Sequence, residues 1–449
     1  MSWKKVKLGE FLIVRDDRFK PNDKAIAELK RIDKIDFSGE IYISDKPSNT
    51  DMILIKKGDL VISGINVEKG AMAVYTGDND ITATIHYSSY SFDETKIDID
   101  FLKYFLKSIK FKNALKEQVP GGIKTEIKPK HLLPLIVNIP TDIKDQKALV
   151  KVLQNRNSKV DAISTELTHQ LSLVKKLRQQ LLQDAVQGKL VPQNPNDEPA
   201  SELLNRIKAE KAKSGKKEKP LPPIKPEEIP FEIPESWVWC RLGDLCSKIG
   251  SGSTPKGSNY SKSGFPFFRS QNIYNEGLVY DDIKFVSDEV QKQMNGTIVL
   301  SNDILLNITG GSMGRCALVP DDFEKGNVSQ HVCIIRPIAV DRNFFHKIVL
   351  SPYFQKFVFS STTGAGREGL PKYNLERFVI PIPPLSEQKR IVHEIEKQLA
   401  KTKQLKEHII ANQQATEQLL KALLHGAFLP AEEAAPAGEV EKMENIEFK

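Results

Sequence analysis

The sequence predicts an α+β fold in which two similar globular domains each lead into a long helix. Three observations predict this fold. The chain contains an imperfect internal repeat, each copy opens with short β-type runs broken by Gly, Asn and Asp, and each copy closes with about 40 residues that lack Pro and Gly. A length of 449 residues also exceeds the ~250 residues at which a single core usually stops growing.

The repeat rests on four colinear matches. WKKVKLGEF resembles WVWCRLGDL, IKKGDLVIS with its following glycines resembles VLSNDILLN and its glycines, IPTDIKDQKALV resembles IPPLSEQKRIV, and QQLLQDAVQGKLVP resembles EQLLKALLHGAFLP. These pairs begin at residues 3 and 237, 55 and 299, 139 and 382, and 179 and 417. Their shared order and slowly drifting offset indicate duplication of a whole unit.

Within each copy, runs such as DLVIS, AMAVY, DILLN and HVCIIRP predict short strands. Residues 101–115 carry an apolar stripe at helical spacing, and residues 344–358 correspond to them. Each copy therefore mixes strands with interspersed helical pieces. A Pro-containing strand then precedes each long helix.

The long helices are predicted at residues 145–188 and 386–427, each about 60 Å long. Their apolar positions follow a heptad, with Gln170 as a polar member, and predict a narrow coiled-coil seam. The predicted seam contains Val160, Ile163, Leu167, Val174, Leu177, Leu181, Ile395, Leu399, Leu405, Ile409 and Leu419. The offset between the copies changes by four residues along the helices, about one turn, so both apolar faces stay in register. We expect an antiparallel pair; the alternative is that each helix packs only on its own domain.

The remaining boundaries follow from composition. We expect globular domains at 1–144 and 236–385, a Pro/Lys-rich linker at 189–235 and an acidic flexible tail at 428–449. A short helix is predicted from Ser201 to about Lys213, and the rest of the linker is expected to be solvated and extended. The lysines from Lys211 to Lys219 either contact phosphate or are solvated.

Composition indicates a soluble protein, with 40% hydrophobic and 27% charged residues. No run approaches the ~18 apolar residues that span a bilayer, and the start lacks the apolar stretch of a signal peptide, so we expect a cytoplasmic protein. The net charge of +7 allows a polyanionic partner but is equally compatible with none.

No catalytic constellation is found in the sequence. The phosphate loop GxxxxGK[ST], HExxH and GxSxG are absent, the cluster GGSMGR at 310–315 lacks nucleotide-loop spacing, and NPND at Asn194 lacks the aromatic residue of a methyltransferase loop. The four cysteines are expected to be reduced and structural. His331 and Cys333 are compatible with a metal site, but a strand with alternate residues buried explains them better, so no metal and no cofactor is expected on this chain.

The stretches DILLNITGGSMGRCALV, GNVSQHVCIIRP, IPIPPLSEQKRIV and LLQDAVQGKLVPQNPNDEPASELL together resemble the specificity subunit of Type I restriction-modification systems. The resemblance covers essentially the whole chain. It implies two target recognition domains that read the halves of a split, asymmetric DNA sequence, and two helices that set the distance between them. It also implies two methyltransferase subunits that carry S-adenosylmethionine, and restriction subunits that use ATP and Mg²⁺. The first copy departs from the family pattern, with TDIKDQK in place of PLSEQK.

Base and phosphate contacts are expected from loops that present Arg, Lys, Asn and Gln. In the second copy the candidates are Lys256, Arg269, Gln271, Asn272, Tyr274, Ser312, Arg315, Arg367 and Lys372. In the first copy they are Lys20, Arg31, Lys69, Lys124 and Lys128. For each of them a solvated charge or a turn residue is the competing interpretation.

Two other functions compete with DNA recognition. One is a single-chain modification enzyme, which would need its own methyl-donor pocket. The other is a non-catalytic coiled-coil scaffold whose globular ends bind proteins, which predicts no salt-dependent DNA binding.

Overall fold

The structure, a computed structural model, describes residues 1–67, 69–119, 126–213, 220–361 and 369–428. It folds into two compact units, one comprising residues 1–168 with residues from 410 onward, and the other residues 169–409. Each long helix thus contributes one part to each unit. No helix in the described ranges has the length and apolar character needed to cross a membrane.

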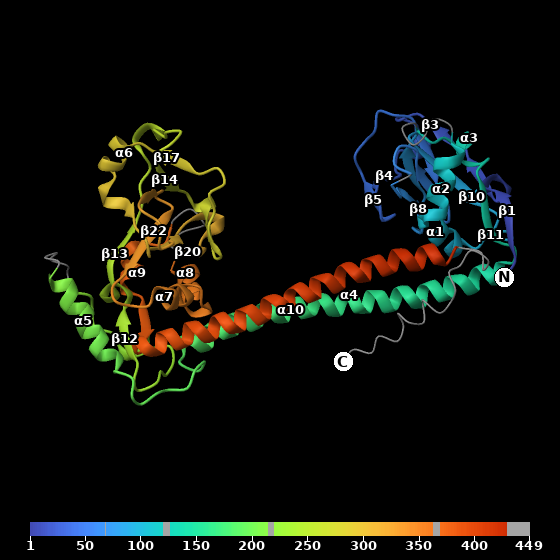
Figure 1. The fold of residues 1–449 in the computed structure, drawn as a ribbon. Helices are drawn as coiled ribbons and strands as arrows, with labels where there is room; N and C mark the ends of the chain where they lie inside the picture. The colour runs from blue at the N-terminus through green and yellow to red at the C-terminus, as the bar shows by residue number, and fades with distance from the viewer. Residues whose placement is uncertain (68, 120–125, 214–219, 362–368, 429–449) are drawn as a thin grey trace. The chain divides into compact units, whose positions relative to one another are not determined.

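In the part of the chain that the structure describes, the first unit contains three sheets, three short α-helices and a part of each long helix (Figure 1). Its strands are β1 (Trp3–Lys7), β2 (Leu12–Arg15), β3 (Arg18–Phe19), β4 (Arg31–Ile35), β5 (Ile41–Ser44), β6 (Met52–Ile55), β7 (Leu60–Ser63), β8 (Met72–Val74), β9 (Ile81–Thr84), β10 (Tyr87–Phe92) and β11 (Ile136–Pro140). Its helices are α1 (Ile99–Lys107), α2 (Ile109–Gln118), α3 (Pro129–Leu132) and the first part of α4 (Ile143–Val186). The sheets have the orders β1-β11, β2-β10-β7-β8 and β3-β6-β9-β4-β5.

The second unit has the same plan with an added hairpin. Its strands are β12 (Val238–Arg241), β13 (Cys246–Ser251), β14 (Phe265–Phe268), β15 (Ile273–Tyr274), β16 (Gly277–Leu278), β17 (Lys284–Val286), β18 (Ile298–Val299), β19 (Ile304–Asn307), β20 (Cys316–Leu318), β21 (Gly326–Val328), β22 (Val332–Pro337) and β23 (Val379–Ile382). Its helices are α5 (Ala200–Lys213), α6 (Asp288–Gln293), α7 (Arg342–Val349), α8 (Pro352–Ser360), α9 (Lys372–Arg377) and the first part of α10 (Leu385–Gly426). Sheet β13-β22-β19-β20 corresponds to β2-β10-β7-β8 of the first unit.

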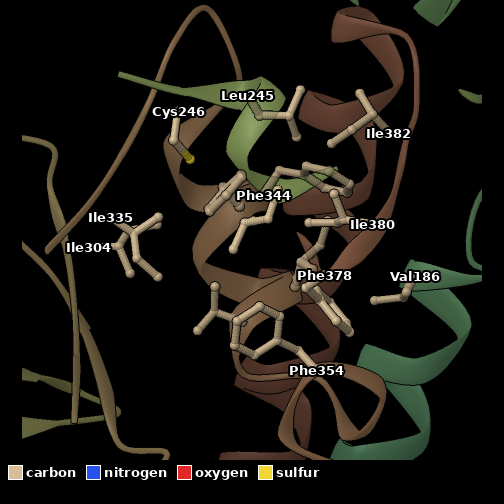
Figure 2. Packing of buried hydrophobic residues seen from close by; sticks show 14 of the residues in the cluster. Val186, Leu245, Cys246, Ile304, Ile335, Phe344, Phe354, Phe378, Ile380 and Ile382 are labelled. Atoms are coloured by element: carbon tan, nitrogen blue, oxygen red, sulfur yellow. The ribbon is translucent and has the colours of Figure 1, made fainter. Parts of the chain in front are cut away.

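The main core of the second unit lies between this sheet and helices α7, α8 and α9. Figure 2 shows Phe354, Phe378 and Ile380 in this cluster, with Val186 of α4 alongside. The opposite face of the sheet is covered by a second cluster that includes Phe268, Val332 and Ile334. Strand β22 is therefore buried on both faces, and the expected alternation of buried and exposed residues in HVC is wrong, since Val332 and Cys333 are both buried.

The two units share hydrogen bonds at matched positions, which confirms the internal repeat. Asp59 and Asp303 each accept the backbone N–H of the residue three positions earlier in the chain. Each also pairs with an arginine, although Arg15 on β2 and Arg336 on β22 do not lie on matched strands. Gln146 and Gln388 each accept a backbone N–H at 2.8 Å and donate to the carbonyl of a proline that precedes the long helix. Side chains of this kind satisfy buried backbone groups, so the duplicated chain keeps them.

The expected helical pieces at 101–115 and 344–358 are each two helices. Ser108 separates α1 from α2, and Ser351 separates α7 from α8. Each serine Oγ donates to a carbonyl at the end of one helix at 2.6 Å and accepts the N–H of the third residue of the next at 3.3 Å. The apolar stripe continues across the break, so periodicity alone did not reveal it.

The two long helices run antiparallel within each unit. In the first unit Val150 and Leu153 of α4 share a core with Leu424 near the end of α10. In the second, Leu181 near the end of α4 shares a core with Ile391 and Ile395 near the start of α10. The antiparallel pair is therefore confirmed.

The predicted seam combined two lines of heptad positions on each helix. The residues of one line are buried as predicted, and the residues of the other line are exposed. The buried residues recur every seventh position, at Leu153, Val160, Leu167, Val174 and Leu181 in α4, and at Gln388, Ile395, Thr402 and Ile409 in α10. The neighbouring heptad line is open, because Ile163, Leu177, Leu405 and Leu419 are exposed. Leu399, one position away from that line, is half-buried. Such a shallow seam covers a single line on each helix rather than the two of a standard coiled coil.

The linker packs onto the second unit, which corrects the expectation of an extended, solvated connector. Leu203 and Ile207 of α5 are buried in the main core. Gln193 donates to Glu387 at 2.7 Å, and Asp197 pairs with Arg390 at 2.6 Å. The amphipathic α5 and these polar partners give the segment enough contacts to order it. At the other end of the chain, Phe428 is also buried, in the core of the first unit, so the expected tail does not begin as a solvated segment.

Candidate nucleic-acid interface

In the second unit the strand registers place four loop regions at one edge. Strands β13 and β22 are antiparallel with Ser251 opposite Cys333, and β19 and β22 are antiparallel with Asn307 opposite Val332. The end of β13, the end of β19 and the start of β22 therefore meet. Loops 252–256, 308–315 and 329–331 extend from this edge. We call these three loops, together with residues 269–275, the loop edge.

The second sheet adds residues 269–275 to the loop edge. Strand β14 is parallel to β21, with Phe268 opposite Val328. The Ser329 N–H donates to the Phe268 carbonyl at 2.9 Å, and Asn307 Nδ2 donates to the Ser270 carbonyl at 2.9 Å. Two sheets thus deliver polar loops to one surface.

Buried polar atoms without a partner concentrate at the loop edge. Within the described ranges four buried side-chain atoms lack a hydrogen-bond partner, and three of them are Arg269 Nε, Asn307 Oδ1 and Ser329 Oγ. Leaving such an atom unpaired costs about 1–3 kcal/mol. This edge is therefore suited to water or a polar ligand.

Arg315 is the best placed cation of the loop edge. Its guanidinium lies over the Tyr274 ring with 4.7 Å between the guanidinium carbon and the ring centroid. The hairpin β15–β16 holds Tyr274 there, because Asn275 accepts the Cys316 N–H at 3.1 Å and fixes the hairpin to β20. Ser312 lies in the same loop and accepts from Asn307 Nδ2 at 3.1 Å. Three of the predicted DNA contacts, Tyr274, Ser312 and Arg315, thus lie close together at the loop edge.

Arg269 and Gln271 lie at the same edge but share a carboxylate. Arg269 Nη2 is 2.9 Å from Asp282 Oδ2, and Gln271 Nε2 is 3.2 Å from the same oxygen. Hydrogen bonds from Lys284 and from Arg269 lower the pKa of Asp282 to about 2. Asp282 therefore stays ionised at neutral pH and pairs with Arg269.

Asn272 is a structural residue, which corrects its assignment as a DNA contact. It is fully buried, accepts the Arg269 N–H and donates to the carbonyls of Val279 and Asp281. These bonds close the turn that carries Arg269 and Gln271. Asn272 thus positions the candidates without being available to DNA.

The other two described candidates of the second unit are exposed lysines. Lys256 lies in a single helical turn of the 252–256 loop. Lys372 pairs with Glu376 at 3.2 Å, and the preceding Leu370 N–H donates to the Ile308 carbonyl, which places this segment beside the loop edge. Arg367 lies outside the described residues.

In the first unit the candidates do not form one cluster. Lys20 pairs with Asp51 at 3.0 Å, Lys69 lies over the Phe37 ring, and Lys128 is 3.6 Å from Glu126. Arg31 is mostly buried and donates to the carbonyls of Lys46 and Ile32. Its role as a DNA contact is therefore corrected to a structural one, because it ties strand β4 to the segment that follows β5. Lys124 lies outside the described residues.

Lys211 is bound within its own unit, since its Nζ donates to the Gly243 carbonyl at 2.6 Å. The DNA role considered for the linker lysines is thus not supported at this position. Lys216, Lys217 and Lys219 lie outside the described residues.

Sequence reasoning missed four polar residues of the loop edge. Thr254, Gln330, His331 and Thr309 form a chain of hydrogen bonds across three loops. The internal repeat could have identified His331, because the first copy has a histidine, His86, at the matched position. The Gly64 N–H donates to the His86 carbonyl in the first unit as the Ile308 N–H donates to the His331 carbonyl in the second, so both copies place a histidine at this edge.

The titratable core groups of the second unit are tuned by burial rather than arranged for catalysis. Burial raises the pKa of the Cys333 thiol to about 12 and lowers that of the His346 imidazole to about 4, where its Nε2 bonds the Cys316 carbonyl. At neutral pH a buried neutral thiol is no nucleophile. These groups serve packing.

Comparison with known proteins shows what the chain resembles. Residues 234–412 match the family model of the Type I restriction modification DNA specificity domain. This stretch, which is less than half of the chain, is therefore similar to the DNA specificity domain of Type I restriction systems. It is 34% identical over 262 residues to the Type I restriction enzyme EcoAI specificity subunit of Escherichia coli, with 56% of this chain and 44% of that protein covered. The chain thus spans less than half the length of that relative.

Two further likenesses cover more of the specificity-subunit fold. The putative type I restriction enzyme MjaX specificity subunit of Methanocaldococcus jannaschii is 27% identical over 382 residues, with 80% of this chain and 76% of that protein covered. A chain in a solved structure of a type I R-M system aligns with a TM-score of 0.57 at 18% identity, covering 95% of this chain and 97% of the other. The structural likeness shows the fold, which includes both units.

Proposed function

We propose that this chain is a non-catalytic subunit that reads a split, asymmetric DNA sequence with its two units. The observation that carries the proposal is the loop edge of the second unit, where the strand registers gather Arg315, Tyr274 and partnerless buried polar atoms on one surface. Arginine and amide side chains on loops are the groups that read base edges and hold phosphates.

The first unit has the same strand frame but different edge residues, which supports an asymmetric target. Its counterpart of the 308–315 loop carries Lys69, and His86 lies 3.3 Å from Glu126 where the second unit has His331 near Thr309. Two such edges offer different donors and acceptors to DNA. We therefore infer that the two half-sites differ in sequence.

The proposed partners are two methyltransferase subunits, which carry S-adenosylmethionine, and restriction subunits, which use ATP and Mg²⁺, all in the cytoplasm. Exposed apolar side chains on the long helices support protein docking, since Leu173 and Leu177 of α4 and Leu405 of α10 are open in the second unit. Leu173 and Leu177 lie one turn apart on the same face of α4, and exposed apolar side chains that adjoin one another are typical of interaction sites. The helices are proposed to set the distance between the half-sites.

Methylation mapping tests the proposal directly. DNA from cells that express this chain with the methyltransferase encoded beside it would be compared with DNA from cells that lack this chain. We expect a split, asymmetric methylated motif only when the chain is present. Methylation of the same motif without the chain, or no motif at all, would contradict DNA recognition and favour a protein-binding scaffold.

A further inference from the structure

The loop edge of the second unit contains a chain of hydrogen bonds. Thr254 Oγ1 donates to Gln330 Oε1, Gln330 Nε2 lies 3.2 Å from His331 Nε2, and His331 Nδ1 lies 2.7 Å from Thr309 Oγ1. The four side chains come from three loops, and Gln330 and His331 are exposed. A long side chain on a surface is rarely held from both sides, so this amide is unusually well positioned.

The hydrogen bonds hold the Gln330 amide from both sides. In the orientation that the structure gives, Thr254 Oγ1 donates to Oε1 and the NH₂ group donates to His331 Nε2, so the ring proton is on Nδ1, beside the Thr309 hydroxyl oxygen. With the amide flipped and the ring proton on Nε2, each of these bonds runs in the opposite direction. Both arrangements use one position on the amide oxygen and one on the amide nitrogen.

Among the residues that the structure describes, each amide atom of Gln330 has one hydrogen-bonding position left. The oxygen has two lone pairs and has accepted one proton from Thr254, and the nitrogen has two protons and has donated one to His331. The remaining pair is one acceptor beside one donor. In the major groove, adenine alone presents the complementary N6–H donor beside the N7 acceptor.

We propose that Gln330 reads an adenine in the half-site recognised by the second unit. The inference rests on the proposed function, and it names one base of the target. The first unit cannot make this contact at the matched position, because Ile85 precedes His86 where Gln330 precedes His331, and Ile85 is 41% exposed with no side-chain hydrogen-bonding group. The adenine therefore belongs to one half-site only.

Methylation mapping of the full chain with its methyltransferase tests the inference through matched variants. Gln330→Ala removes both amide contacts, and we expect discrimination at one A·T position of one half-site to fall by about 5- to 150-fold. Gln330→Glu keeps acceptors and loses the donor, so we expect the preference at that position to move toward cytosine, whose N4 donates. Gln293→Ala is the control, because Gln293 is an exposed glutamine outside the loop edge. It is the last residue of α6, which follows β17 in the chain. Strand β17 ends at Val286, opposite Phe265, and Phe265 is at the other end of β14 from Phe268.

The outcomes separate the two proposals. A wild-type chain that directs no split motif overturns the proposed function and the inference with it. A wild-type motif that stays unchanged in Gln330→Ala, or that relaxes at a position other than A·T or in both half-sites, overturns the inference alone. Thermal unfolding of Gln330→Ala should match that of Gln293→Ala, because both side chains are exposed, and a lower midpoint for Gln330→Ala would identify a folding role instead.

Discussion

Arg315 offers the sharpest test of the loop edge, because its charge and its support can be removed separately. The guanidinium lies 4.7 Å from the Tyr274 ring centroid, and an exposed contact of this kind is worth about 0.5–1 kcal/mol. Removing the ring with Tyr274→Ala should therefore weaken specific DNA binding by about 2- to 5-fold. Tyr274→Phe keeps the ring and should bind nearly as well as wild type.

Removing the cation has a larger and different effect. If Arg315 contacts a guanine, Arg315→Ala loses about 1–3 kcal/mol, or about 5- to 150-fold in affinity. If it contacts a phosphate, Arg315→Ala reduces the slope of log affinity against log salt by about 0.9. Arg315→Lys keeps the charge, so it should keep the slope and lose only the bidentate discrimination.

The assay is a salt titration of the full chain with its methyltransferase on a duplex that carries the mapped motif and on a scrambled duplex. Lys325→Ala is the control, because Lys325 makes a similar contact, 4.6 Å from the Phe265 ring centroid, at the opposite end of β14. Arg315→Ala with unchanged affinity and slope would refute the assignment of this edge to DNA. Equal losses for Tyr274→Phe and Tyr274→Ala would refute the role of the ring.

Four further outcomes follow from the structure. Asp282→Asn releases Arg269 from its ion pair, so non-specific DNA binding should tighten and the salt slope should steepen by up to about 0.9; an unchanged slope would show that Arg269 does not reach phosphate. Asp303→Asn breaks an ion pair in which the fully buried Asp303 carboxylate accepts from Arg336 at 2.6 and 2.8 Å. The variant should lose about 3–5 kcal/mol of unfolding free energy, and a denaturation midpoint equal to that of the wild type would contradict this prediction. Burial lowers the pKa of His346 to about 4, whereas an unfolded histidine titrates near ~6.5. The unfolded state therefore binds the proton first, and the unfolding free energy of the second unit should fall by about 3 kcal/mol as the pH falls from about 6.5 to about 4. His346→Gln should remove that loss in urea unfolding at pH 7, 5 and 4, and an identical pH dependence in the variant would contradict the assignment. Deleting four residues from the middle of one long helix, about 6 Å of rise, should alter the tolerated spacer and leave both half-sites unchanged; the reverse result would contradict the role of the helices as a spacer.

The repeat made the architecture predictable, because duplicated segments carry the same buried frame. Long segments without Pro or Gly identified α4 and α10, and their apolar positions indicated the pair. Periodicity could not show which heptad line was covered. Ile163 and Leu177 satisfy the pattern as well as Val160 does, yet they are exposed because the helices contact along a single line.

The linker was misjudged because its composition is that of a solvated segment. Pro, Lys and Glu dominate it, but its few apolar side chains lie on one face of α5 and its polar side chains find partners far away in sequence. Arg241 illustrates the point: it is buried, pairs with Glu228 and donates to the carbonyls of Pro222 and Pro223. The linker has no counterpart in the first copy, so comparing the two copies could not reveal these contacts, and no local sequence pattern predicts them.

The candidate site was predictable as a set of loops and less so as a set of side chains. Arg315 and Tyr274 were chosen for their residue type and lie together, whereas Asn272 and Arg31 were chosen for the same reason and are structural. A polar side chain that closes a turn and one that faces solvent look alike in one sequence. Burial alone separates them, and burial depends on the fold.

The proposed reading of two different half-sites requires that the edge residues can change while the buried residues that hold the strands stay the same. Asp59 and Asp303, like Gln146 and Gln388, satisfy buried groups, so replacing either member of a pair would leave unpaired polar atoms in the core. Ile85 and Gln330 occupy matched exposed positions beside a backbone hydrogen bond that both units keep. A change there alters what the surface offers to DNA without disturbing the core. Because the frame fixes where the edge residues lie, the identity of each edge residue can vary on its own, and each unit can acquire a separate half-site.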